Sequence, residues 1–160
     1  MVKATFEIKE MPAFHVAAMR HVGPYDQIGA AFGRLMGWAG ARGLLRFPET
    51  KVLAVYHDDP DTIDASSLRS DACVTVPEGT AVDPGMATMT IPGGLFAVGH
   101  FEIDDTEYGA AWARLSSEFL PTSGCELDDR MCYEMYLNDP EQHPEHKHVV
   151  DICEPVRRAG

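Results

Sequence analysis

Hydrophobic and polar positions along the first half of the chain change their period twice. Residues 3–9 and 13–21 alternate in the way that half-buried strands do. After Gly23-Pro24, hydrophobic residues recur at intervals of three and four, the spacing of a helix that lies on a sheet. This predicted helical stripe consists of Ile28, Ala31, Phe32, Leu35 and Ala39. Apolar runs at 51–57 and 72–76, separated by a polar loop over 58–71, then predict two further strands.

The second half of the chain repeats this order of strand, strand, helix, strand, strand. Its predicted elements are strands at 86–91, 95–103, 131–137 and 148–153, with a helix at about 106–120. With an offset of 80 residues, the two halves align without a gap between residues 28 and 77. Segments 28–35 and 108–115 share five of eight residues. A period of half the chain that occurs twice indicates two fused copies of one unit, residues 1–80 and 81–160.

Two such copies predict a single α+β domain over residues 1–160. We expect tandem β-β-α-β-β units that form a mainly antiparallel sheet, with two helices on one side and a pseudo-two-fold axis between the copies. The chain has 160 residues and 45% hydrophobic content, which is enough to bury a core. Gly29, Gly33 and Gly37 share one face of the first predicted helix, where we expect close backbone packing.

Composition excludes several classes of function. The chain has 13 Lys and Arg against 25 Asp and Glu, a formal net charge of −12, so direct nucleic-acid binding is not expected. No apolar run reaches membrane-spanning length and the N-terminus lacks the apolar segment of a signal peptide, so we expect a cytoplasmic protein without membrane association. The four cysteines, Cys73, Cys125, Cys132 and Cys153, form no Cys-x-x-Cys pair and are predicted to be buried reduced thiols.

Two segments carry candidate metal ligands, and neither has the spacing of a metal site. His143, His146 and His148 lie close together in a proline-containing turn, but no fourth ligand of matching spacing accompanies them. The acidic run over 58–64 lacks the Gly and the Glu that a calcium loop requires. We therefore expect no metal and no cofactor.

The difference between the copies that bears most on function is Glu134. Alternation along the predicted strand 131–137 places Glu134 on the same face as Tyr136. The first copy has Ala54 at the equivalent position, whereas Tyr56 and Tyr136 are common to both copies. A single Glu on a strand is most simply exposed to water. Alternatively, an acid among aromatic residues in a cleft is the arrangement that holds a flat or hydrophobic cation.

Several segments, in this order, resemble the GyrI-like small-molecule-binding domain, which also forms the effector-binding half of multidrug-sensing transcription activators. They are residues 20–25 (RHVGPY), 120–124 (LPTSG) and 132–140 (CYEMYLNDP), set within the duplicated plan. The resemblance implies an SHS2-like tandem fold, a ligand cleft between the repeats and a cleft glutamate that meets hydrophobic cations. By its place in the Tyr-Glu-Met-Tyr motif, this glutamate is Glu134.

The chain departs from the family pattern before its second helix. Many members repeat a Gly-Pro-Tyr turn there, and this chain has residues 102–106 (EIDDT) instead. We also expect a stand-alone domain, without a helix-turn-helix segment that reads DNA.

Three functions are compatible with this pattern. The first is capture of hydrophobic, aromatic or cationic compounds by Glu134, with Tyr136, Tyr56 and Trp112 as aromatic walls, although core packing explains Trp112 equally well. The second, implied by the resemblance, is hydrolysis of cyclopropane-bearing alkylating compounds, with Glu134 as general base and Tyr136 as hydroxyl donor. The third, also implied by the resemblance, is an inhibitory contact with DNA gyrase. We favour binding, because a shared fold does not transfer an activity.

Overall fold

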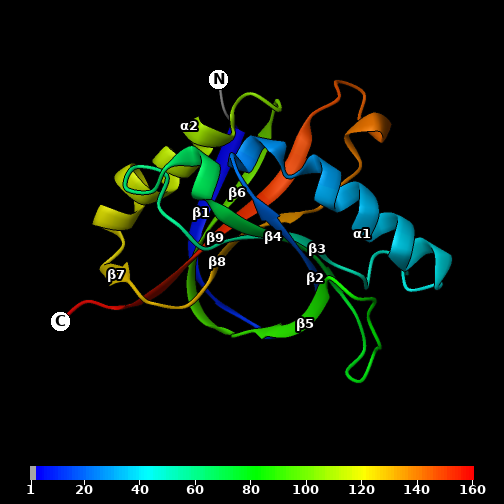
Figure 1. Ribbon diagram of the computed structural model, residues 1–160. Coiled ribbons are helices and arrows are strands. Elements are labelled where there is room, and N and C mark those ends of the chain that lie inside the picture. Colours follow the sequence, from blue (N-terminus) through cyan, green and yellow to red (C-terminus); the bar gives the residue numbers. More distant parts are fainter. Residues whose placement is uncertain (1–2) are drawn as a thin grey trace. The chain divides into compact units, whose positions relative to one another are not determined.

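The computed structural model describes residues 3–160 and contains two compact units (Figure 1). One unit is formed by residues 13–91. The other combines the N-terminal strand with residues 92–160. Every strand pair within each unit is antiparallel, and each unit carries one helical layer, which confirms the predicted α+β class.

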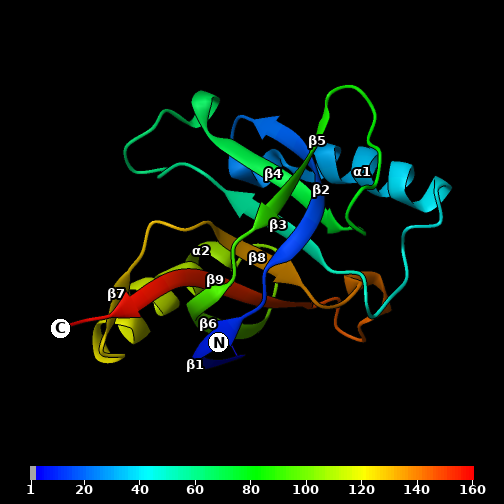
Figure 2. The ribbon, with the colours of Figure 1, turned by 90° about the horizontal axis from the view of Figure 1, so that it is seen from below.

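The unit of residues 13–91 is a four-stranded sheet with one helix packed on it. The strands lie in the order β3 (Val52–Tyr56), β4 (Arg69–Thr75), β2 (Phe14–Val22) and β5 (Met86–Ile91). A 3-10 turn (Tyr25–Gln27) leads into α1 (Gly29–Ala41), which packs against β4 and β2 (Figures 1 and 2). A second 3-10 turn (Ala65–Ser67) precedes β4. Three of the five residues of the predicted stripe, Ala31, Leu35 and Ala39, are almost fully buried.

The other unit has the strand order β1 (Lys3–Met11), β6 (Gly94–Ile103), β9 (His148–Arg158) and β8 (Cys132–Tyr136). The short β7 (Cys125–Leu127) pairs with the C-terminal end of β9 (Figure 2). The helical layer begins with α2 (Tyr108–Ala113) and continues as a π-helical segment (Arg114–Phe119) and a 3-10 turn (Leu120–Thr122). A further 3-10 turn (Pro140–Gln142) follows β8. The helical residues Ala111 and Leu115 pack on β6 and β9 to form the core of this unit.

Each compact unit includes the first strand of the other copy of the duplicated sequence. Strand β1 pairs with β6, and β5 pairs with β2. The chain passes between units at Pro12 and again at Pro92, which are 80 residues apart. Proline has no backbone N–H to continue a strand ladder, so both prolines mark the end of a strand. The boundary of the units therefore differs by one strand from the boundary of the sequence repeats.

Two polar contacts are repeated in both copies. The backbone N–H of Arg69 donates to Oδ2 of Asp58 over 2.8 Å, and that of Val149 donates to Oδ1 of Asn138 over 2.9 Å. Both acceptors follow the third strand of their copy and fix the turn there against the fourth strand. Likewise, Arg20 pairs with Asp71 and His100 pairs with Asp151. Contacts that both copies keep are explained by folding.

Several details differ from the sequence-based expectation. Strand β4 begins at Arg69, so the end of the predicted loop over 58–71 belongs to the sheet. Strand β9 continues past 153 to Arg158, and the short β7 was not predicted. The expected packing of Gly29, Gly33 and Gly37 is wrong, because a Cβ at any of them would meet no atom within 4 Å.

No helix in residues 3–160 is both long enough and apolar enough to cross a membrane. Burial of Cys73, Cys125 and Cys153 confirms the prediction for three of the four thiols, while Cys132 is partly exposed.

The exposed glycines of α1 give a direct test of the helix assignment. Gly33→Ala is expected to stabilise the protein by about 0.5–1 kcal/mol, because alanine restricts the unfolded chain and its methyl group enters open space. Gly99→Ala in β6 is the opposite case, since a Cβ there would lie 2.5 Å from the buried ring of Phe101. Urea unfolding should show a higher midpoint for the first variant and a lower one for the second. A lower midpoint for Gly33→Ala would contradict the exposed helical position.

Candidate functional site

Strand β8 carries Glu134 on the face of its sheet that the helical layer covers. Glu134 pairs with Ile152 of β9, and Tyr136 pairs with Val150. Paired residues share a face, and both Ile152 and Val150 belong to the core beneath α2 and the π-helical segment. Glu134 is only 4% exposed. The simple expectation that it faces water is therefore wrong.

The carboxylate of Glu134 accepts two short hydrogen bonds from aromatic side chains. Nε1 of Trp112 donates to Oε2 over 2.5 Å, and the hydroxyl of Tyr136 donates to Oε1 over 2.6 Å. Trp112 belongs to α2, so one donor comes from the helix and the other from the strand that carries the acid. Both donors are neutral, and these two contacts therefore bring no positive charge to the carboxylate.

One turn before Trp112 on α2, Tyr108 extends this polar group. Its hydroxyl lies 2.7 Å from Nδ1 of His148, the first residue of β9. Burial and, after it, the negative charge of Glu134 raise the pKa of Tyr108. Tyr108, Trp112 and Tyr136 all pack against the core of this unit. The structure thus brings three of the predicted site residues together, Glu134, Tyr136 and Trp112, and adds Tyr108, which was not predicted as a site residue.

Two other tyrosines have different surroundings. Tyr56 ends β3 in the unit of residues 13–91, where its ring centroid lies 4.7 Å from that of Tyr25. Its role as a wall of the ligand site stays a prediction. Tyr133 lies on the opposite face of β8 from Glu134, is fully buried, and packs with its ring centroid 5.5 Å from that of Phe96.

The acid and its helical donor occur together in one copy of the duplication. At the positions equivalent to Trp112 and Glu134, the first copy has Phe32 and Ala54. An aromatic ring is therefore kept on the helix, while the N–H donor and the carboxylate are both specific to the second copy. This paired difference is the signal in the sequence that identifies Trp112 as the partner of Glu134.

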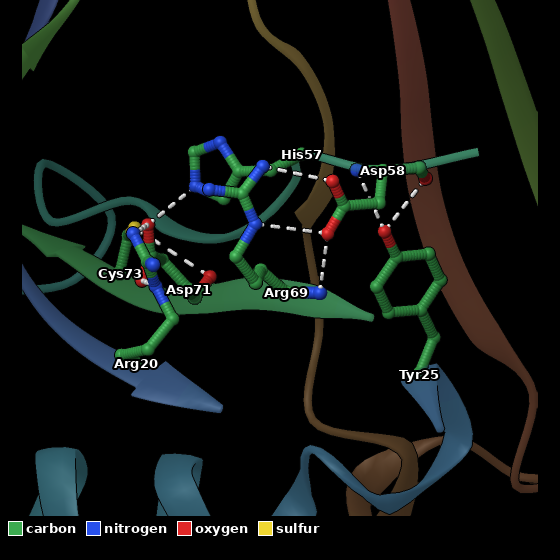
Figure 3. A network of polar contacts seen from close by, with 7 residues as sticks. All are labelled: Arg20, Tyr25, His57, Asp58, Arg69, Asp71 and Cys73. Atoms are coloured by element: carbon green, nitrogen blue, oxygen red, sulfur yellow. Dashed lines mark hydrogen bonds and ion pairs between the residues drawn. The ribbon is translucent and has the colours of Figure 1, made fainter. Parts of the chain in front are cut away.

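A second polar network lies in the unit of residues 13–91 and centres on Asp71 of β4 (Figure 3). The buried carboxylate accepts from Nε of Arg20 over 2.7 Å and contacts Nε2 of His57 over 2.6 Å. Burial raises the pKa of Asp71, but the hydrogen bonds with His57 and Arg20 outweigh it and leave the pKa lowered. Since the second copy repeats the acid and its β2-equivalent partner as Asp151 and His100, we assign this network to folding.

Beside it, Asp58 fixes the loop after β3 (Figure 3). Oδ1 and Oδ2 accept from Nη2 and Nε of Arg69 over 2.8 and 3.0 Å. The hydroxyl of Tyr25 donates to the carbonyl of Asp58 over 2.7 Å and lies 2.9 Å from its backbone nitrogen. Tyr25 of the Gly-Pro-Tyr segment therefore fastens the start of the helical region to this loop.

The three clustered histidines have separate partners. His143 lies 3.2 Å from Glu102, His148 contacts Tyr108, and His146 lines an open groove of about 490 Å³ with Asp104, Asp105, Glu141 and Glu145 among its other walls. Across residues 3–160, no three His, Cys, Asp or Glu side chains are grouped so as to hold a metal ion.

Comparison with known proteins agrees with this architecture. Residues 4–157 match the GyrI-like small-molecule-binding domain. The chain belongs to the GyrI-like family. The family match covers nearly the whole chain and includes residues of both compact units.

Proteins similar to this GyrI-like chain include a named DNA gyrase inhibitor and solved structures of the same fold. It is 35% identical over 139 residues to DNA gyrase inhibitor 2 of Dickeya dadantii, covering 84% of this chain and 86% of that protein. The crystal structure of the EcmrR C-terminal domain has a TM-score of 0.78 at 17% identity, covering 98% and 99% of the two chains. SAV2435, solved bound to tetraphenylphosphonium, has a TM-score of 0.61 at 11% identity and covers 96% and 94%. At these identities the two structures support the fold.

The interaction between Trp112 and Glu134 can be tested with residues taken from the first copy. Trp112→Phe is expected to lower the free energy of unfolding by about 1–3 kcal/mol, because it removes a donor from a buried carboxylate. Adding Glu134→Ala recreates the Phe and Ala pair of the first copy and should recover part of this loss. Urea unfolding of the two single variants and the double variant forms a double-mutant cycle. Additive losses would show that the two side chains are not coupled.

The role of Asp58 can be tested by measuring how the stability of the protein depends on pH in the acid range. The hydrogen bonds from Arg69 lower the pKa of Asp58 from 3.8 to about 2. A lowered pKa stabilises the folded state above the ordinary pKa, and this contribution disappears as the pH falls from about 4 through about 2. Asp58→Asn, which introduces the residue that the second copy has as Asn138, should remove that part of the acid dependence. Unfolding curves of both proteins between neutral pH and pH 2 would measure it, and parallel pH profiles would contradict it.

Proposed function

We propose that the protein captures hydrophobic aromatic cations, with Glu134 as the acid that selects for positive charge. The observation that carries this proposal is a carboxylate 4% exposed to solvent that is held by two neutral aromatic donors, Trp112 and Tyr136.

Burying a charge costs several kcal/mol unless an opposite charge or enough hydrogen bonds compensate for it. Trp112 and Tyr136 hold both carboxylate oxygens in place and leave the formal charge unchanged. A ligand that supplies positive charge in a low-dielectric surrounding gains more from this acid than it would at the surface. The arrangement therefore favours a cation over a neutral compound of equal shape.

The aromatic side chains around the acid favour delocalised or bulky cations. Each good cation–π contact contributes about 0.5–2 kcal/mol, and it tolerates many ligand shapes because it depends on the ring face. We assign this role to Trp112 and Tyr136, with Tyr56 as a further predicted wall. The predicted cleft between the repeats stays part of this proposal.

The test is a titration with tetraphenylphosphonium and with neutral triphenylphosphine oxide, on the wild type and on Glu134→Gln. The substitution keeps the side-chain volume and removes the charge. We expect the wild type to prefer the cation by about tenfold or more, and the variant to lose this preference while still binding the neutral compound. Calorimetry or tryptophan fluorescence would measure both affinities, since Trp112 contacts the substituted residue.

Glu118→Gln is the matched control, because Glu118 is exposed on the π-helical segment and its loss changes the net charge equally. It should bind both compounds like the wild type. Equal preference for the cation in the wild type and in Glu134→Gln would refute the proposal.

Hydrolysis of a strained electrophile is a second candidate, favoured by the hydroxyl of Tyr136 only 2.6 Å from Glu134. In this case Glu134 would act as general base on a water molecule and Tyr136 would donate a hydrogen bond to the developing oxyanion. Incubation with a cyclopropane-bearing alkylating compound, followed by chromatography, would reveal a ring-opened product. Hydrolysis no faster than the uncatalysed reaction would exclude catalysis and leave ligand binding as the proposed function.

The name of the Dickeya dadantii relative makes inhibition of DNA gyrase a third candidate. A supercoiling assay with purified gyrase and excess protein tests it directly. Unchanged supercoiling would remove this candidate without affecting the binding proposal.

A further inference from the structure

A second buried carboxylate, Glu154, lies on the same face of the sheet as Glu134. Strand β9 points Ile152 and Val156 into the core beneath the helical layer, and Glu154 lies between them in the alternation. Glu154 is 6% exposed. Its Oε1 accepts a short hydrogen bond from the hydroxyl of Ser116 on the π-helical segment. Among residues 3–160, its Oε2 has no hydrogen-bond partner.

Two side chains of the helical layer, one turn apart, donate hydrogen bonds to the two acids. Trp112 donates to Glu134, and Ser116, four residues later, donates to Glu154. Because Glu134 pairs with Ile152, Glu154 is its diagonal neighbour on the adjacent strand. Such neighbours lie about 7–8 Å apart on one face of a sheet. The two acidic residues therefore lie on one face of the sheet, at a residue spacing that a small planar molecule can span.

The first copy of the duplication has an apolar pair at the positions equivalent to Ser116 and Glu154. The first copy has Met36 and Val74 where the second has Ser116 and Glu154. An apolar pair is thus sufficient for the fold at these positions. A buried carboxyl oxygen without a partner costs stability, and burial raises the pKa of Glu154 against the opposing hydrogen bond from Ser116. Ser116 also lies in a π-helical segment, a feature frequent at functional sites.

We propose that Glu154 is a second acidic subsite, which binds the second positive group of a planar dication whose first positive group contacts Glu134. This inference rests on the proposed function, because it places Glu154 in the site that Glu134 defines. The ligand class is an aromatic molecule with two amidinium or comparable N–H-bearing cationic groups. Its second group supplies both the donor that Oε2 lacks and the charge that keeps the carboxylate ionised.

The experiment compares three planar probes of one shape. Terephthalamidine is a dication, its analogue with one amidine replaced by an amide is a monocation, and terephthalamide is neutral. Their affinities are measured by calorimetry for the wild type, Glu134→Gln and Glu154→Gln, with Glu118→Gln as the control for lost surface charge. The double variant Ser116→Met with Glu154→Val installs the pair of the first copy and serves where Glu154→Gln fails to fold.

The wild type and the control should bind the dication about tenfold to a hundredfold more tightly than the monocation. Glu154→Gln and the double variant should bind both equally, with unchanged affinity for the monocation. A dication preference that survives in both variants, or is absent from the wild type, would overturn the subsite. If Glu134→Gln alone left the affinities for the monocation and for tetraphenylphosphonium unchanged, the proposed function itself would fail.

Discussion

The carboxylate of Glu134 is buried, and burial of a charge without hydrogen bonds is too costly for a folded domain to sustain. Two of the donors that bond it come from different elements, Trp112 from α2 and Tyr136 from β8. The helix must therefore lie on the sheet in one rotation about its axis, with Trp112 directed at the acid. The same rotation directs Tyr108 at His148 and Ser116 at Glu154, because the three helical residues are four apart. One buried charge thus fixes the arrangement of the whole helical layer of this unit.

The duplication separates the requirements of the fold from those of the site. Polar contacts found in both copies, such as Arg20 with Asp71 and His100 with Asp151, fasten neighbouring strands and recur because both copies need them. The polar pairs between helix and sheet do not recur. Their equivalents in the first copy are wholly apolar: Ile28 and Leu68, Phe32 and Ala54, Met36 and Val74. A requirement of folding would have appeared in both copies, so these three pairs point to a function of the second copy.

Local patterns in the sequence predicted most elements, because hydrophobic period reports directly on helix and strand. They could not predict that β1 and β5 pair outside their own copies, since every half-buried strand has the same period. The C-terminal half of β9 was missed because Pro155 interrupts the run, and proline argues against a central strand. Glu134 was identified from the difference with Ala54, but its burial and its donors depend on contacts between residues far apart in the chain. Glu154 lies just beyond the predicted strand, where the alternation of the sequence could not assign it to a face.

The two copies also divide stability and selectivity between them. Apolar side chains such as Phe32 and Met36 stabilise a helix on a sheet without needing a hydrogen-bond partner. Carboxylates in the same position reduce that stabilisation, and least where nearby donors satisfy them. A duplicated fold can keep one apolar interface and let the other acquire acids, whereas a single copy would lose stability with every such change. For the proposed function, the aromatic rings beside Glu134 would accept many ligand shapes, and charge would be the property by which the site discriminates among hydrophobic compounds.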